Sequence, residues 1–296
     1  PRVAGAGWPA SPACVLSRNA WASGTNLALR LTVKQASNWA DINVVIRLLM
    51  WPFARKDGTL YLSQQDLQTV VAPLLSPPRN RSGERVQTTC LDPGHGGRDP
   101  GNLDGRQQEK KYTLLLGLDL AAQLKQLGFK VVMTRTGDTY PELPARPDLA
   151  KSSHADLFLS LHFNSFRSPE IKGSQVYCMT PRGAISSQAR GESMSAYSFP
   201  GNVNDDKNIL LAYQIQKSLT RDLHADDRGV QHARRAVQRH AGMPAVLVEA
   251  GDRSNPTQAR STHDATYRRQ RAQGIATASV ASKKHAERRN PTPVRR

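Results

Sequence analysis

Three short apolar runs, each followed by a polar residue, most constrain the fold of this chain. They span residues 89–91, 157–161 and 245–248, and the last two lead directly into His162 and Glu249. Near-continuous apolar runs of this kind are typical of strands buried on both faces of a parallel sheet. The chain is therefore expected to contain a central sheet whose buried strands end in chemically useful side chains.

Helical patterns lie between these runs. Residues 112–127 carry leucines at three- and four-residue spacing, and Gly128 follows as a stop signal. Residues 208–223 repeat the pattern. Strands that alternate with helices indicate an α/β fold with helices on both faces of one sheet. Because ligands in such folds bind beyond the carboxyl ends of the strands, His95, His162 and Glu249 are expected to meet at one rim.

His95 stands in a turn built for close approach. Its neighbours in the turn at 92–97 are a proline and three glycines, which give the backbone unusual freedom. Glu109 lies just before the helix at 112–127, where the helix dipole alone also favours an acidic residue. Each residue by itself is more often structural, but two histidines and a carboxylate together form a recognised catalytic zinc set. Glu249 would then supply a general base.

Six segments match the motifs of one enzyme family in order and spacing. They are LDPGHGGRDPG at 91–101, EKK at 109–111, TRTGD at 134–138, ADLFLSLHFN at 155–164, Arg228-Gly229, and PAVLVEAG at 244–251. Through them, the stretch from about Arg85 to about Ala278 resembles the zinc-dependent N-acetylmuramoyl-L-alanine amidases, cell-wall hydrolases of the amidase-3 type.

The resemblance implies a fold and a set of site residues. The fold is a single mixed, mainly parallel sheet flanked by helices on both faces. The metal ligands fall on His95, Glu109 and His162, and the catalytic glutamate falls on Glu249. Zinc in such a site lowers the pKa of a bound water from ~15.7 towards ~7.

The resemblance also implies a reaction. The bond cut is the amide between N-acetylmuramic acid and L-alanine, so stem peptides leave peptidoglycan during cell-wall remodelling or daughter-cell separation. Glu249 takes the water proton and passes it to the departing amine. Asp92 is a candidate to orient the turn or to hydrogen-bond a ligand histidine, although loop aspartates often only cap turns. Asn164 is a candidate substrate contact, with a role in a turn as the alternative.

The chain departs from the family pattern in two places. Asp252-Arg253 stand where apolar or aromatic residues are usual, next to the catalytic carboxylate, and two charges there are expected to alter its pKa or the wall of the pocket. Pro144 and Pro147 interrupt the helix before Asp156, which is therefore predicted to start near Pro147. The loop at 182–208 lacks the apolar periodicity of an inhibitory helix, so it is predicted to be a substrate-side loop in which Glu192 is able to bind a metal.

Composition divides the chain into four parts. Residues 1–76 hold all four tryptophans and lack the family motifs, so they form an accessory segment, with the end of a truncated small domain as the alternative. Residues 77–84 are a linker by composition. Residues 85–282 form the catalytic domain, and 283–296 form a basic tail that is expected to be disordered.

Net charge limits the expected partners, and the cysteines are considered with it. The net charge is +17, from 41 basic against 24 acidic residues, which favours anionic partners. The resemblance makes peptidoglycan the substrate and anionic envelope polymers further candidates. Nucleic acid is not expected, because no aromatic stacking platform interleaves the basic clusters. Cys90 and Cys178 are predicted to be buried thiols.

The location of the protein rests on the resemblance alone. No signal peptide is found in the chain, and no run is long enough for a transmembrane segment. The family implies the periplasm or the cell wall. Two other functions stay open: a zinc peptidase or amidase of other specificity, and a non-catalytic protein that binds the envelope or a polyanion on the same fold.

Overall fold

The computed structural model describes residues 14–15, 31–33, 39–42, 45–52, 54–56, 59–80, 84–187 and 197–287. Glu192 and residues 288–296 lie outside these ranges, so the expectations for Glu192 and for most of the basic tail are not addressed by the structure.

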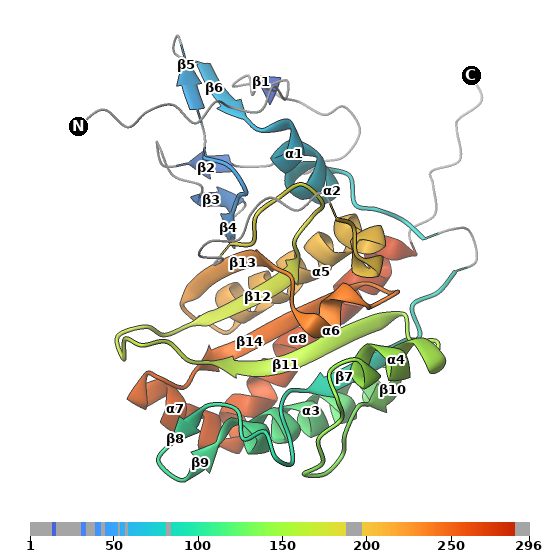
Figure 1. The fold of residues 1–296 in the computed structure, drawn as a ribbon, viewed down its shortest axis with the longest axis vertical. Helices are drawn as coiled ribbons and strands as arrows, with labels where there is room; N and C mark the ends of the chain where they lie inside the picture. The colour runs from blue at the N-terminus through green and yellow to red at the C-terminus, as the bar shows by residue number, and fades with distance from the viewer. Residues whose placement is uncertain are drawn as a thin grey trace.

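A nine-stranded sheet forms the centre of the molecule (Figure 1). In spatial order its strands are β10 (Lys130–Met133), β7 (Thr88–Pro93), β11 (Leu157–Asn164), β14 (Ala245–Asp252), β12 (Ser174–Met179), β13 (Asp227–Ala233), β4 (Val45–Leu48), β3 (Trp39–Ile42) and β2 (Leu31–Val33). The first four strands are parallel, and β12 runs antiparallel to β14. The predicted mixed, mainly parallel sheet is therefore confirmed.

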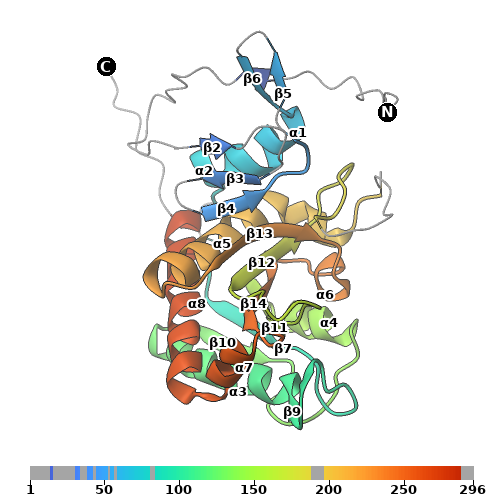
Figure 2. The same cartoon turned by 90° about the vertical axis from the view of Figure 1, so that its left-hand side faces the viewer.

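Helices cover both faces of this sheet, as predicted. Figure 2 shows α3 (Glu109–Gln126), α5 (Asp205–Lys217) and α8 (Ala265–Ala286) on one face, and α4 (Ala145–Ser152) and α6 (Ala236–Arg239) on the other. The leucines of α3 point into the main core, where they pack with strand residues; Leu116, Leu120 and Leu124 are fully buried. Burying such side chains contributes about 1.5–3 kcal/mol each, and this term holds α3 on the sheet.

The motif residues lie at the end of the sheet where the connections after β7 and β14 begin. We call this end the catalytic end. The short hairpin β8 (Leu103–Asp104) and β9 (Gln107–Gln108) follows β7, and α7 (Pro256–His263) follows β14. Both lie at the lower left in Figure 1, beyond the carboxyl ends of the parallel strands. The loops that carry the motif residues therefore gather at this end.

The N-terminal part of the chain contributes to two sheets. Strands β2, β3 and β4 extend the main sheet, because β4 pairs with β13. The strands β1 (Cys14–Val15), β5 (Ala54–Lys56) and β6 (Thr59–Leu62) form a separate small sheet. One helical stretch, α1 (Gln64–Asp66), η1 (Leu67–Val71) and α2 (Ala72–Leu75), then leads to the predicted linker. The division of the chain at residues 77–84 stays a prediction.

Three local expectations need correction. Helix α4 begins at Ala145 rather than near Pro147, and Pro147 falls within its first turn, where a missing N–H is tolerated. Helix α8 runs to Ala286, so Lys283 and Lys284 belong to a helix rather than to a tail. His232 stands outside the motifs, and its place in the sequence predicts a surface residue, but the side chain is buried, and its Nδ1 lies 3.4 Å from Cys178 Sγ.

The expectation for two of the cysteines is confirmed. Cys90 and Cys178 are both buried free thiols. Burial, with the neighbouring Asp92 carboxylate, raises the pKa of Cys90 to about 12, so this thiol stays protonated and unreactive.

Candidate metal centre and active site

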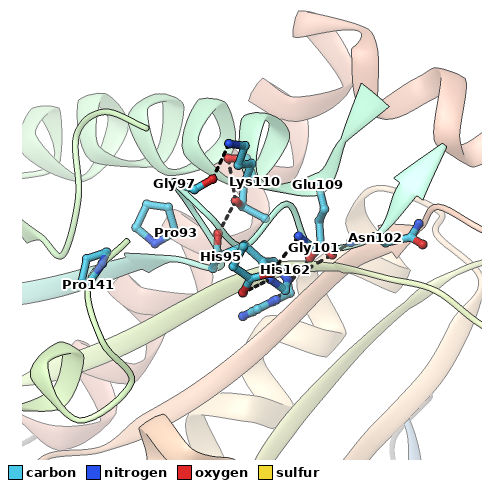
Figure 3. A network of polar contacts seen from close by, with 12 residues as sticks. Pro93, His95, Gly97, Gly101, Asn102, Glu109, Lys110, Pro141 and His162 are labelled. Atoms are coloured by element: carbon cyan, nitrogen blue, oxygen red, sulfur yellow. Dashed lines mark hydrogen bonds and ion pairs between the residues drawn. The ribbon is translucent and has the colours of Figure 1, made fainter. Parts of the chain in front are cut away.

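Three side chains from distant parts of the chain converge at the catalytic end of the sheet. His95 comes from the turn after β7, Glu109 is the first residue of α3, and His162 lies near the end of β11. Their candidate ligand atoms all lie within 4.8 Å of one another, and Figure 3 shows the two imidazoles and the carboxylate side by side. The sequence placed these three residues at one rim, and the structure brings them together in a group that is able to hold a metal ion.

Glu109 is held so that it faces both histidines. Its Oε2 lies 3.1 Å from His95 Nε2, and its Oε1 lies 3.2 Å from His162 Nδ1. The backbone N–H groups of Asn102 and Phe163 donate to the same two oxygens at 2.9 and 3.0 Å. Because the carboxylate is only 4% exposed, these contacts leave it one orientation. The helix dipole of α3 also favours its negative charge.

Ionisation at this group depends on the contacts between the three residues. Burial alone would raise the pKa of Glu109, but hydrogen bonds to His162 and His95 hold it well below its usual range. Burial acts to lower the pKa of His95, yet hydrogen bonds to Glu109 and Asp99 raise it to about 9. Without a metal, His95 is thus an imidazolium at neutral pH, and the cluster already has one cation beside its carboxylate.

Metal binding should therefore release a proton. A ligand imidazole must be neutral, so zinc is expected to displace about one proton from His95 at pH 7. Between about pH 6.5 and about pH 8, the apparent zinc affinity should rise by up to about tenfold per pH unit. Isothermal titration calorimetry in buffers of different ionisation enthalpy measures the proton count. Zinc binding at pH 7 with no proton release would contradict this protonation of His95.

The glycines of the turn leave room for the histidine rings. A Cβ on Gly94 would lie 2.2 Å from His162 Cε1, and a Cβ on Gly101 would lie 2.7 Å from His95 Cδ2. His95 itself adopts a left-handed backbone conformation with φ of 62°, which is uncommon for a residue with a side chain. The spacing of glycines around His95 thus reflects space for the ligands as well as backbone freedom.

A methyl group at position 94 should move a ligand. Gly94→Ala places its Cβ inside the His162 ring, so the ring must shift and zinc affinity should fall by at least about tenfold, in line with ~10–100-fold losses for displaced ligand geometry. A fluorescent chelator competition assay measures the change. The control is Gly242→Ala, because a Cβ there meets nothing within 4 Å. Equal zinc affinity for the two variants would refute the steric argument.

Asp99, rather than Asp92, contacts a ligand histidine. Asp99 Oδ2 lies 2.8 Å from His95 Nδ1 and so fixes which ring nitrogen faces Glu109. Asp92 is 1% exposed and lies beneath the turn, where it accepts hydrogen bonds from Ser160 and Thr134 and pairs with Arg146 at 2.8 Å. The sequence suggested either role for Asp92, and its contacts support the turn.

Two buried arginines hold the backbone of this turn. Arg146 donates to the carbonyl oxygens of Pro141 and His95 at 3.0 and 3.1 Å. Arg135 donates to those of Pro93 and Gly94 at 2.9 and 2.8 Å. These contacts set the path of the chain on both sides of the strained His95. These contacts were not predictable from the sequence, because an arginine in a motif carries no sign of which carbonyl groups it meets.

Glu249 lies beside His162 on the neighbouring strand. The two residues are register partners in the parallel pair β11 and β14. Glu249 is 8% exposed, and its Oε2 is buried without a hydrogen-bond partner among the residues that the structure describes. Burial raises its pKa to about 7, while nearby His162 opposes that rise. An unpaired carboxylate with a pKa near neutrality suits a general base that acts at neutral pH.

The unusual Asp252-Arg253 pair is taken up by other contacts. Asp252 accepts hydrogen bonds from the backbone and side chain of Ser254, and its own N–H donates to Gln258 at 2.7 Å. The Arg253 guanidinium donates to Thr262 and lies 4.7 Å from the centre of the Tyr112 ring. The largest effects on the pKa of Glu249 come from burial, His162 and Glu109 rather than from this pair. The pair therefore builds the junction between β14 and α7.

Asn164 is the last residue of β11, and both its backbone and its side chain accept hydrogen bonds from the residues around it. Its carbonyl oxygen accepts the N–H of Arg253 at 2.7 Å, and its side-chain oxygen accepts the N–H of Ser165. These contacts fit the role in a turn that the sequence also allowed. A substrate contact by Asn164 stays a prediction.

A separate cavity of about 300 Å³ lies at the opposite end of the parallel strands. Its lining includes Asn80, Val86, Asp156, Lys207 and Pro244, and none of the four predicted site residues. The candidate site is therefore the rim around Glu249 and the histidines, and not this cavity.

The donor set fits a zinc ion. Two imidazoles and one carboxylate leave a fourth position for water or substrate, as catalytic zinc sites require. The buried Glu249 Oε2 lies on the strand next to His162 and is free to take a proton from a group at that position. Within the described part of the chain, no helix is long and apolar enough to cross a membrane.

Comparisons with known proteins agree with this geometry. Residues 89–280 match the Amidase_3 family, described as N-acetylmuramoyl-L-alanine amidase. The N-acetylmuramoyl-L-alanine amidase AmiC of Neisseria meningitidis is 34% identical over 222 residues, which cover 68% of this chain and 53% of AmiC. The amidase AmiA of Escherichia coli is 31% identical over 225 residues, which cover 68% of this chain and 78% of AmiA.

Solved structures show the same fold. The amidase AmiC2 of Nostoc punctiforme superposes with a TM-score of 0.56 at 28% identity, over 68% of this chain and 98% of AmiC2. An amidase of Clostridium difficile gives a TM-score of 0.57 at 27% identity, over 67% of this chain and 97% of that protein. The part of the chain that matches is the part that carries the motifs and the metal-binding group. This chain therefore belongs to the Amidase_3 family of N-acetylmuramoyl-L-alanine amidases.

Proposed function

We propose that this protein is a zinc-dependent N-acetylmuramoyl-L-alanine amidase that removes stem peptides from peptidoglycan. The observation that carries the proposal is the joint placement of His95, Glu109 and His162, with ligand atoms within 4.8 Å, beside the buried Glu249. The chain spans about half the length of the meningococcal relative, so activity, substrate and partners are proposed for the whole protein.

Each residue has a defined part in the proposed reaction. His95, Glu109 and His162 would hold the ion, which when bound acidifies a water and polarises the scissile carbonyl group. Glu249 accepts a proton at Oε2 and later donates it to the nitrogen of the departing L-alanine. Asp99 orients His95, and Arg135 and Arg146 keep the His95 turn in place.

A digest of purified peptidoglycan tests the proposed activity. Mass analysis of the soluble products should find free stem peptides with L-alanine at the amino terminus and glycan chains without peptides. Activity should disappear in a chelator and return with added zinc. Cleavage at another bond would instead mark a peptidase or amidase of other specificity. Zinc binding with no hydrolysis would mark a non-catalytic envelope-binding protein.

The proposed substrate also gives the place of action. Peptidoglycan lies outside the cytoplasmic membrane, so we place the protein in the periplasm or at the cell wall. The charge of +17 suits a surface that meets anionic envelope polymers. The segment before residue 77 is proposed to be an accessory part of the chain, which precedes the catalytic part from residue 85 and is joined to it by the linker at 77–84.

A further inference from the structure

Strands β12 and β13 bring their first residues to the catalytic rim. Both run antiparallel to β14, so their amino ends lie beside its carboxyl end (Figure 1). Gln175, the second residue of β12, is the direct register partner of Glu249. Residues directly opposite in an antiparallel pair share one face of the sheet, as do residues two apart along a strand. Gln175 and Tyr177 therefore lie on the face that carries Glu249.

A buried polar chain runs along this face. Arg228 Nε donates to Gln175 Oε1 at 3.2 Å, and Gln175 Nε2 donates to the hydroxyl oxygen of Tyr177. Gln175 and Tyr177 are both almost fully buried. The reaction assigned to Glu249 uses none of these groups. Their burial beside the catalytic carboxylate needs another explanation.

Two arginines flank this polar chain, each stacked on an aromatic ring. Arg228 is the second residue of β13 and starts at the rim, whereas Arg235 follows the carboxyl end of β13 and precedes α6, so its side chain reaches Tyr177 from the opposite end of the sheet. The Arg235 guanidinium lies 4.8 Å from the centre of the Tyr177 ring, and that of Arg228 lies 4.5 Å from the centre of the Phe166 ring. Stacking keeps a guanidinium plane fixed while its N–H edge stays available. Arg235 is exposed and Arg228 is half-buried.

Neither arginine forms an ion pair within the described ranges. No carboxylate there lies within ion-pair distance of either guanidinium, whereas three cations near the His95 turn are paired: Arg98 with Glu142, Lys110 with Asp138, and Arg146 with Asp92. One carboxylate does interact with Arg228 at longer range, because burial raises the pKa of Asp252 and Arg228 acts against that rise. The positive charge of Arg235 reaches the catalytic carboxylate, because it acts to lower the pKa of Glu249 against the effect of burial. Positive charge therefore lies along the β12–β13 side of Glu249, from Arg228 at the rim to the Arg235 guanidinium over Tyr177, and is available to a bound anion.

The chemical structure of the substrate indicates which of its anionic groups would bind there. The lactyl carboxyl group of N-acetylmuramic acid is consumed in the scissile amide, so the nearest free carboxylates belong to the peptide. The first one beyond L-alanine is the α-carboxylate of the second residue, a D-glutamate linked onward through its side chain. A guanidinium edge matches a carboxylate with two parallel hydrogen bonds.

We propose that Arg228 and Arg235 form a subsite for this α-carboxylate and so select stem peptides with an ionised second residue. The inference rests on the proposed amidase function. It adds the orientation of the bound substrate, in which the stem peptide extends from the metal centre towards β12 and β13. The glycan then lies on the opposite side of Glu249, towards α3 and the β8–β9 hairpin.

Paired soluble substrates test the subsite. Two N-acetylmuramoyl tripeptides are compared that differ only in the second residue, which carries a free α-carboxylate in one and an α-carboxamide in the other. The zinc-loaded wild-type protein should show a kcat/KM about tenfold or more higher for the carboxylate form, as expected for a charge-assisted hydrogen bond. Arg235→Gln and Arg228→Gln should bring this ratio close to one.

The ratio is the readout because any general loss of activity cancels in it. Arg235→Lys keeps the charge without the paired N–H edge and should keep part of the preference. The matched control is Arg269→Gln, which removes an exposed arginine of α8 on the far face of the sheet and should leave the ratio unchanged. An unchanged ratio in Arg235→Gln and Arg228→Gln, or no preference in the wild type, overturns the subsite.

A binding measurement separates failure of the subsite from failure of the proposed function. Calorimetric titration with the two free tripeptides, the expected products, should show tighter binding of the carboxylate form by the wild type and equal binding by Arg235→Gln. If the wild-type protein hydrolyses neither substrate, the amidase function fails, and this titration alone decides the subsite. If the variants lose binding only to intact cell walls, the arginines serve anionic wall polymers and the inference is wrong.

Discussion

Glu249→Gln should lower kcat by about 10²–10⁴ while zinc binding stays intact. Glutamine has nearly the shape of glutamate, but its amide cannot accept a proton in the way that a carboxylate does. Glu249 Oε2 is buried without a hydrogen-bond partner in the described part of the chain, so in the wild type this oxygen is available to accept a proton. Turnover of purified peptidoglycan, measured by release of stem peptides, gives kcat for the variant and the wild type.

The zinc content of the variant decides what a low rate means. Glu249 is not one of the three residues whose ligand atoms cluster, so Glu249→Gln should bind one zinc per chain, as the wild type does. Glu109→Gln is the matched control, because the same change on a ligand carboxylate should weaken zinc binding as well as turnover. A Glu249→Gln protein with normal zinc and wild-type turnover would exclude this residue as the general base.

Arg146→Met should lower the free energy of unfolding by about 3–5 kcal/mol, the usual cost of leaving one member of a buried ion pair alone. Arg146 and Asp92 are 2% and 1% exposed and lie 2.8 Å apart. Methionine also removes the hydrogen bonds to the carbonyl oxygens of Pro141 and His95. Urea unfolding of the zinc-free protein measures the change, and zinc affinity should fall because the His95 turn is released.

An exposed pair from the same region supplies the control. Arg98 and Glu142 form an ion pair with side chains 72% and 62% exposed, and such pairs contribute about 0–1 kcal/mol. Arg98→Met should therefore have little effect on unfolding. Similar losses for Arg98→Met and Arg146→Met would mean that burial of the Asp92 pair is not what stabilises the turn.

The convergence of His95, Glu109 and His162 was predictable because each residue follows a signal that local physics explains. Apolar runs mark the buried strands, and the side chains at their carboxyl ends meet at one rim, which placed His162 and Glu249. The glycines around His95 marked a turn with room for close approach, and the structure shows that Gly94 faces the His162 ring. Motif order and spacing then joined these separate signals into one site.

What escaped prediction depends on contacts across the fold. The direction of β12 is not written in its own residues, since a strand buried along its whole length has the same pattern either way. Arg146 and Asp99 are ordinary polar residues until the fold brings them to Asp92 and His95. His232 was misjudged for the same reason, because its burial comes from neighbouring strand residues rather than from its own segment.

The most direct test of the account is where the metal binds. Crystals of the protein grown with zinc should give one strong anomalous peak at about 2.0–2.2 Å from His95 Nε2, a Glu109 oxygen and His162 Nδ1, the distances of a catalytic zinc site. Glu249 should lie close to the open fourth position without binding the ion. A zinc ion bound elsewhere, with these three side chains empty or turned apart, would contradict the account.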